Sequence, residues 1–177
     1  QYSLSLSDPE LALRLVNALE QYWGDARSTF NEAQHWTEAV ITKTRGLKSV
    51  RRAKALRTLV YSLVHINPIL YASQINAYIA EAMDIYTMLD GPQDACSLLW
   101  YQAKFEYSTG ERKKGIALLD QCIRDAGILD DKYLQARAGA TLAWILMMGG
   151  ALDRGRKVAE ESVRLSPELD DPYALDH

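Results

Sequence analysis

Apolar side chains recur every three or four residues along most of this chain, which is the spacing that places them on one face of an α-helix. The first such stretch begins with Asp8 and Pro9, which suit the cap and the first position of a helix. Its apolar positions are Leu11, Leu15, Ala18, Leu19 and Tyr22. No segment alternates strictly between apolar and polar residues over a useful length, so the pattern predicts helices and no β-sheet.

Turn-forming residues divide this helical pattern into hairpins that repeat about every forty residues. The breaks fall at Gly24-Asp25, Gly46, Asn67-Pro68, Asp90-Gly91-Pro92, Thr109-Gly110-Glu111 and Gly149-Gly150. The predicted hairpins span residues 8–44, 50–90, 92–128 and 131–167, within a single repeat domain of residues 1–177. The segment 171–175 repeats the opening of the first helix, so we expect a truncated fifth unit from residue 171.

A hairpin of this kind cannot bury its apolar face alone and must stack on its neighbours. Small residues recur where the two helices of a hairpin would cross closely: Ala82, Ala103, Gly115, Ala143 and Gly155. A larger side chain at such a crossing would cost about 1–3 kcal/mol by overpacking. We therefore predict an all-α fold, a superhelical solenoid of about four hairpins.

Composition restricts the partners without identifying one. The 177 residues carry a formal net charge of −3, which gives no general attraction to nucleic acid or to an anionic membrane. No apolar run approaches the roughly 20 residues that span a bilayer, and the N-terminus lacks the basic flank and apolar stretch of a secretory signal. We expect a cytoplasmic chain that is either a piece of a larger protein or a processed product, with Cys96 and Cys122 as buried reduced thiols.

Catalytic and metal-binding patterns are missing from the sequence. The histidines His35, His65 and His177 are scattered, and no cysteine or carboxylate stands at ligand spacing from His35 or His65. His65 precedes the Asn67-Pro68 stop and is expected to cap carbonyl groups there. No nucleophile stands with a base, so we predict no enzyme, no cofactor and no bound metal.

The fourth unit resembles the tetratricopeptide repeat. The residues at its small, packing and terminal proline positions are Ala143, Gly155, Ala159, Ser162 and Pro167, although Gly139 stands where the repeat has tryptophan. Segments 11–23 and 30–40 are similar to the tetratricopeptide-like region of bacterial LuxR-type ATP-dependent activators and antibiotic-pathway regulators. This resemblance implies a right-handed superhelix of tetratricopeptide-like hairpins that follows a nucleotide-binding domain and receives an inducer or a partner protein. The sequence itself holds no phosphate-binding Gly-rich loop and no DNA-reading helix-turn-helix.

In such repeats the first helix of each hairpin lines the concave face, with positions i, i+3, i+7 and i+10 pointing inward. Transferred to this sequence, the spacing gives Arg57, Val60, Val64, Asn67, Ser97, Trp100, Lys104, Tyr107, Arg137, Ala140, Trp144 and Met147, with Tyr22 from the first unit. Five of these residues are expected to form a groove of aromatic and cationic side chains: Trp100, Lys104, Tyr107, Arg137 and Trp144. Tyr22 and Arg57 are further binding candidates. The alternative is that Trp100 and Trp144 pack between repeats.

A basic stretch without acidic residues leads into the second hairpin: Lys43, Arg45, Lys48, Arg51, Arg52, Lys54 and Arg57. In one interpretation it attracts phosphate or an acidic partner domain. We favour the other interpretation, a solvated loop and helix face, because such runs are common. Aromatic residues do not alternate with these charges, so stacking of single-stranded nucleic acid is not expected.

These patterns favour a non-catalytic recognition domain, the sensor or scaffold segment of a bacterial transcriptional regulator. A standalone adaptor or chaperone-like scaffold is the alternative. The expected partner is a protein or peptide, with a small-molecule inducer as a second candidate, and no direct binding to nucleic acid or membrane is expected. An exposed apolar end of the repeat array would also allow a weak homodimer.

Overall fold

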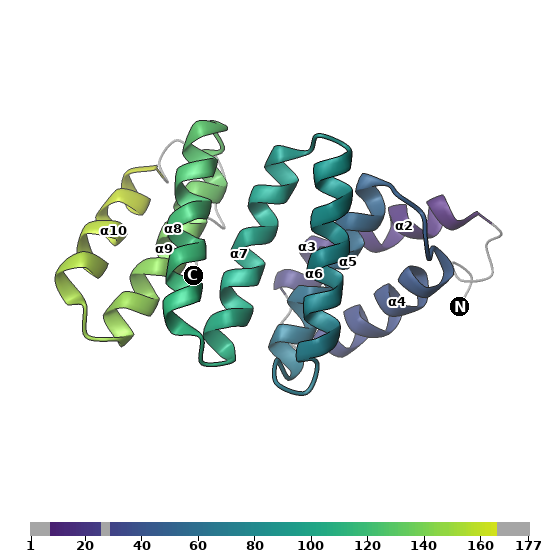
Figure 1. The fold of residues 1–177 in the computed structure, drawn as a ribbon, viewed down its shortest axis with the longest axis horizontal. Coiled ribbons are helices and arrows are strands. Elements are labelled where there is room, and N and C mark those ends of the chain that lie inside the picture. Colours follow the sequence, from purple (N-terminus) through teal and green to yellow (C-terminus); the bar gives the residue numbers. More distant parts are fainter. Residues whose placement is uncertain (1–7, 26–28, 166–177) are drawn as a thin grey trace. The chain divides into compact units, whose positions relative to one another are not determined.

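The computed structural model describes residues 8–25 and 29–165, and every regular element in these ranges is an α-helix (Figure 1). The helices are α2 (Pro9–Ala18), α3 (Glu20–Asp25), α4 (Phe30–Lys43), α5 (Val50–Ile66), α6 (Ala72–Met88), α7 (Pro92–Ser108), α8 (Arg112–Ile128), α9 (Lys132–Met148) and α10 (Leu152–Leu165). The all-α prediction is confirmed for these residues. Pro167, His177 and the expected fifth unit from residue 171 lie outside the described residues.

The helix ends follow the turn residues of the sequence, with one exception. Helix α5 begins at Val50 and ends directly before Asn67-Pro68, as predicted. The first helix differs from the prediction, because it stops at Ala18 and α3 restarts at Glu20. The backbone N–H of the intervening Leu19 is shared between the carbonyl oxygens three and four residues back, which tightens the chain at this point.

The repeat period of about forty residues extends into the turns. Gly110 and Gly150, inside the third and fourth hairpins, adopt positive φ angles of 94° and 82°. Asp90 and Asp130 do the same between hairpins, with φ angles of 51° and 54°. Left-handed backbone is uncommon for residues with a Cβ, but aspartate tolerates it better than most side chains. The turns inside the third and fourth hairpins therefore share a backbone conformation, whereas the turn at Asn67-Pro68 inside the second hairpin differs.

The chain forms two compact units, Gln1–Tyr101 and Gln102–His177, and α7 contributes to both. In the first unit α5 packs against α2, α4 and α6, so it lies at the centre of the core. Leu56, Leu59 and Leu63 on α5 are fully buried and recur at three- and four-residue spacing, as the sequence pattern predicts. Burial of each such leucine contributes about 1.5–3 kcal/mol.

In the second unit α9 packs against both α8 and α10. The helix crossings depend on glycine, because a Cβ added at Gly115 would lie 2.9 Å from the carbonyl oxygen of Ala103. A Cβ added at Gly155 would lie 3.2 Å from the carbonyl oxygen of Ala143. Both distances are shorter than ordinary van der Waals contact, so the small-residue crossings predicted at these positions are confirmed.

Cys96 and Cys122 are buried thiols, as predicted. The side chain of His65 is exposed, and its Nδ1 lies 2.8 Å from the carbonyl oxygen of Tyr61 near the end of α5. The Tyr61 carbonyl lies inside α5 and not at the stop, so the expected capping by His65 stays a prediction. Within the described ranges, no helix combines the length and the apolar content that crossing a bilayer requires.

Candidate binding surfaces

The basic stretch is not a uniformly solvated face, because Arg52 is only 2% exposed. Its Nη1 donates hydrogen bonds to the carbonyl oxygen of Ile41 and to Oγ1 of Thr44, each at 2.7 Å. Its Nε donates to a carboxylate oxygen of Glu81 at 2.8 Å. These contacts join the end of α4 to α5 and α6, and they satisfy a carbonyl that the end of a helix leaves without a partner. The expectation of a solvated stretch is therefore wrong for Arg52.

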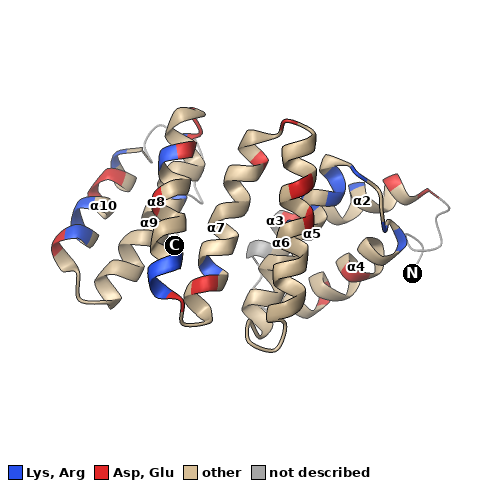
Figure 2. Cartoon of the chain, viewed as in Figure 1, with Lys and Arg blue, Asp and Glu red and all other residues tan. Residues whose placement is uncertain are grey.

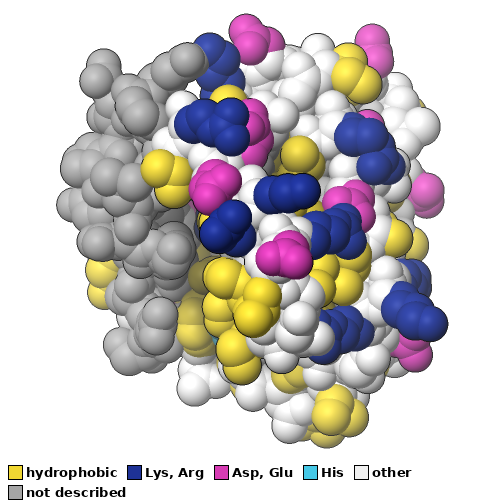
Figure 3. Space-filling model, turned by 90° about the vertical axis from the view of Figure 1, so that its left-hand side faces the viewer, with side chains coloured by type: hydrophobic (Ala, Val, Ile, Leu, Met, Phe, Trp, Pro, Cys, Tyr) yellow, Lys and Arg dark blue, Asp and Glu magenta, His cyan; other side chains and the backbone are white. Residues whose placement is uncertain are grey.

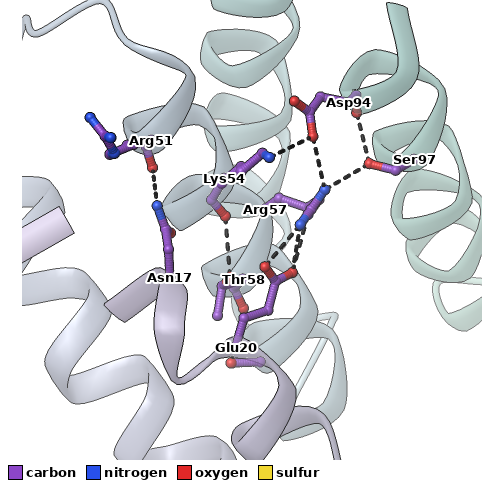
Figure 4. Close-up of polar contacts among 9 residues, drawn as sticks. Asn17, Glu20, Arg51, Lys54, Arg57, Thr58, Asp94 and Ser97 are labelled. Atoms are coloured by element: carbon purple, nitrogen blue, oxygen red, sulfur yellow. Dashed lines mark hydrogen bonds and ion pairs between the residues drawn. The ribbon is translucent and has the colours of Figure 1, made fainter. Parts of the chain in front are cut away.

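Arg57 is the centre of a second ionic cluster, which joins α3, α5 and α7 within the first unit (Figure 4). Its Nη2 donates to both carboxylate oxygens of Glu20 at 2.8 Å. Its Nη1 donates to Oγ of Ser97 at 2.8 Å and lies 3.6 Å from Oδ1 of Asp94. Burial is the largest single influence and acts to lower the pKa of Arg57, but the charges of Glu20, Tyr101 and Tyr86 and the hydrogen bond to Glu20 together outweigh it, and the pKa is raised. The side chain of Arg57 therefore stabilises the packing of α3, α5 and α7, and it is not included in the proposed binding surface.

The acidic partners in this cluster, Glu20 and Asp94, were not anticipated from the sequence. A usable signal was nevertheless present, because Lys54 and Asp94 stand about one repeat apart, as do Arg57 and Ser97. The ammonium group of Lys54 lies 3.4 Å from Asp94. Residues at equivalent positions of successive hairpins meet when the hairpins stack, so complementary pairs at the repeat spacing indicate contacts.

The other candidates of the first unit differ in exposure. Trp100 is 4% exposed, and its ring meets the ring of Tyr101 edge to face with the centroids 4.7 Å apart. Trp100 thus has the packed environment that the alternative interpretation described, and we leave it out of the proposed surface. Tyr22 is exposed on α3 and stays a binding candidate.

Four predicted groove residues lie together in the second unit, on α7 and α9. We call Lys104, Tyr107, Arg137 and Trp144 the aromatic–cationic surface. Trp144 is 51% exposed, and its ring meets the ring of Tyr107 with the centroids 5.6 Å apart. The guanidinium of Arg137 lies 5.9 Å from the centre of the Tyr133 ring, a cation–π arrangement. The pKa of Lys104 is lowered to about 8, mainly by burial and secondly by the charge of Arg137.

Replacing Lys104 by methionine is expected to stabilise the chain at pH 7 by about 1 kcal/mol, after allowance for solvent screening of a partly exposed charge. Below about pH 8 this lysine is protonated in both the folded and the unfolded chain, so the penalty for burying its charge is complete. Between pH 8 and its ordinary value of 10.5 the folded chain releases the proton first, and the penalty disappears as the pH rises. Urea unfolding of both proteins at about pH 7 and pH 10 measures the difference.

Lys113 on α8 provides the control, because its side chain is exposed. Its replacement by methionine is expected to change stability by less than about 0.5 kcal/mol at either pH. If Lys104→Met stabilised the chain equally at pH 7 and pH 10, packing and not charge would be the cause of the higher stability.

The outer face of α10 is another exposed surface of the second unit, where side chains of both charges lie between hydrophobic ones (Figure 3). A shallow hollow on this face is lined by Arg156, Ala159, Glu160, Val163 and Arg164. Charged residues are frequent on α10 and sparse on α9 (Figure 2). Among the described residues, no group of three or more His, Cys, Asp or Glu side chains is placed to hold a metal ion.

No protein-family model matches this sequence, and no curated protein matches it. The backbone is nevertheless similar to solved structures. One is a Rap protein complexed with Competence and Sporulation Factor, with a TM-score of 0.78 and 11% identity over 96% of this chain and 47% of that chain. Another is BtubC (BKLC) from P. vanneervenii, with a TM-score of 0.71 and 16% identity over 93% of this chain and 66% of that chain.

These similarities show the fold alone, because 11% and 16% identity are too low to carry function. The fold is a tetratricopeptide-like helical repeat, which confirms the predicted fold class. This chain spans about half the length of the Rap protein. The narrower resemblance to LuxR-type regulators stays a prediction.

Proposed function

We propose that this chain is a non-catalytic recognition domain that binds a protein or peptide through the aromatic–cationic surface of its second unit. The observation that carries the proposal is Trp144, a half-exposed aromatic side chain that contacts Tyr107 on a neighbouring helix. Tryptophan, tyrosine and arginine dominate the binding energy of many protein interfaces. Stacked hairpins also present extended surfaces to partners, and the similar Rap protein is complexed with Competence and Sporulation Factor.

We further propose that the domain is the sensor or scaffold segment of a cytoplasmic bacterial transcriptional regulator, with a standalone adaptor or chaperone-like scaffold as the alternative. The likeness of segments 11–23 and 30–40 to such regulators supports the first. An ATPase domain in the same polypeptide would favour the regulator, whereas repeats alone would favour the adaptor. A metabolite that raises the unfolding temperature would favour a small-molecule inducer as ligand.

Selection of a random-sequence peptide library on the immobilised chain tests the recognition function. Peptides that bind are expected to lose affinity about tenfold or more when Trp144 is replaced by alanine, because that substitution removes the largest exposed aromatic contact. Ile128→Ala is the matched control, since Ile128 is 82% exposed on α8 of the same unit. If no selected peptide distinguished the Trp144 variant from the parent chain, the proposed function would be wrong.

The exposed outer face of α10 supports a separate proposal, a weak homodimer through this face. Val163 is exposed there and lines the shallow hollow on this face. Sedimentation of the chain and of a Val163→Glu variant would test the dimer.

A further inference from the structure

Two cations lie together at one end of the aromatic–cationic surface. Arg137 on α9 is close enough to Lys104 on α7 to oppose its charge. Lys104 stands about one helical turn before Tyr107, and Arg137 stands about two turns before Trp144. The rings of Tyr107 and Trp144 are in contact, and each cation precedes the ring on its own helix. Lys104 and Arg137 therefore lie on the same side of the two rings.

The other end of the same surface is apolar. Met147 and Met148 follow Trp144 on α9 and are exposed, the latter by 67%, and Leu152 at the start of α10 is also exposed. No charged residue stands between Arg137 and Met148 in the sequence. Contiguous apolar side chains at a surface mark a contact with another molecule, and methionine adapts its shape to different partners.

We infer that the partner is a peptide segment that presents an acidic side chain next to an apolar one. The acidic group binds between Lys104 and Arg137, and the apolar side chain packs on Trp144 and Met147. Charge complementarity selects the acid, because two adjacent cations repel each other and a carboxylate makes charge-assisted hydrogen bonds with both. This inference rests on the proposed function and adds the chemistry of the partner.

Single-stranded nucleic acid is the competing class, since it offers phosphates for the cations and bases that stack on aromatic rings. The surface favours a peptide, because one helical turn after Trp144 it continues with the exposed Met147 and not with a further basic residue. A nucleic-acid strand needs a basic groove that follows its backbone, and the net charge of −3 gives no general attraction.

The sequences selected from the random peptide library test this chemistry. They are expected to be enriched in Asp or Glu beside Leu, Ile, Phe or Met, and replacing the acid of the tightest peptide by its amide should weaken binding about tenfold. The double variant Lys104→Met, Arg137→Gln should bind the tightest peptide about tenfold more weakly than the parent chain does. Arg124→Gln, at an exposed cation on α8, is the control and should bind as the parent does. A peptide set without enrichment in acids, or equal affinity for the double variant, would overturn the inference.

The pH dependence of peptide affinity distinguishes a specific role of Lys104 from a general effect of positive charge. Affinity for the tightest peptide is expected to fall as the pH rises above about 8, because Lys104 loses its proton there while Arg137 stays charged. Glu106, two residues after Lys104 on α7, is itself paired with Lys114 of α8 at 2.6 Å. Lys104→Arg should keep the affinity at about pH 9, since arginine is not deprotonated in proteins. An equal fall in that variant would contradict the role of Lys104.

The possible outcomes distinguish the two proposals. Peptides that depend on Trp144 but not on an acidic residue would overturn the inference and leave the recognition function in place. Tighter binding of an oligothymidylate than of any selected peptide would overturn the inference in favour of nucleic acid. Peptide binding that ignores Trp144 would overturn the proposed function itself.

Discussion

Replacing Arg52 by methionine is expected to lower the free energy of unfolding by about 3 kcal/mol. The substitution keeps most of the aliphatic stem but removes the donors to Ile41, Thr44 and Glu81. The carbonyl of Ile41 then loses a charged partner in a place that water reaches poorly, and this loss exceeds the value of the hydrogen bond itself. The carboxylate of Glu81, which is 28% exposed, loses its ionic partner as well. Urea unfolding followed by far-ultraviolet circular dichroism measures the change.

The neighbouring residue Arg51 is the matched control for this prediction. Its side chain is 53% exposed and pairs with Glu10, so the same substitution should cost less than about 0.5 kcal/mol. The Arg51 carbonyl oxygen, which accepts a hydrogen bond from Asn17, is unaffected by a side-chain change. Equal losses at the two positions would contradict the buried role of Arg52.

Replacing Gly115 by leucine is expected to destabilise the second unit by about 3 kcal/mol, and replacing it by alanine by about 1 kcal/mol. A Cβ at this position lies 2.9 Å from the carbonyl oxygen of Ala103 and 3.3 Å from the backbone nitrogen of Tyr107. Both contacts are with backbone atoms of α7, so relief requires the helix itself to move. The loss should grow with the size of the side chain, and thermal unfolding of the two variants measures it.

Gly127 is the control within the same helix. A Cβ there meets the amide end of the Gln135 side chain at 3.0 Å, and that flexible side chain can move away. Gly127→Ala should therefore be neutral or stabilise the chain by up to about 1 kcal/mol, because alanine is the better helix former. The contrast between two glycines of α8 isolates steric fit from helix propensity. A stabilising effect of alanine at both positions would show that the crossing at Gly115 is looser than the structure indicates.

Much of the fold could be predicted from the order of residue types. The stop at Asn67-Pro68 and the start of α5 at Val50 follow from local backbone preferences, which act over a few residues. The close crossings at Gly115 and Gly155 follow from the repeat, because equivalent positions have equivalent neighbours. The break at Leu19 was not predicted, since apolar spacing continues through it and nothing local requires the helix to stop.

The candidate site was predicted only in part. The repeat spacing selected Arg57, Trp100 and Trp144 alike as residues facing a partner. The structure buries Trp100, occupies the donors of Arg57 with Glu20 and Ser97, and exposes Trp144. Position within a repeat identifies which face of a helix a side chain is on. It does not identify what the next helices place opposite that side chain.

The sequence by itself determined the helices, their turns and the repeat that stacks them, because these depend on local conformational preference and on the spacing of apolar residues. Only the tertiary structure decided which charges are buried and which aromatic rings are exposed. Arg51 and Arg52 are the same residue type at adjacent positions, yet one is solvated and the other joins three helices. Burial, and with it the energy of a charge, depends on atoms that the fold brings together from distant parts of the chain.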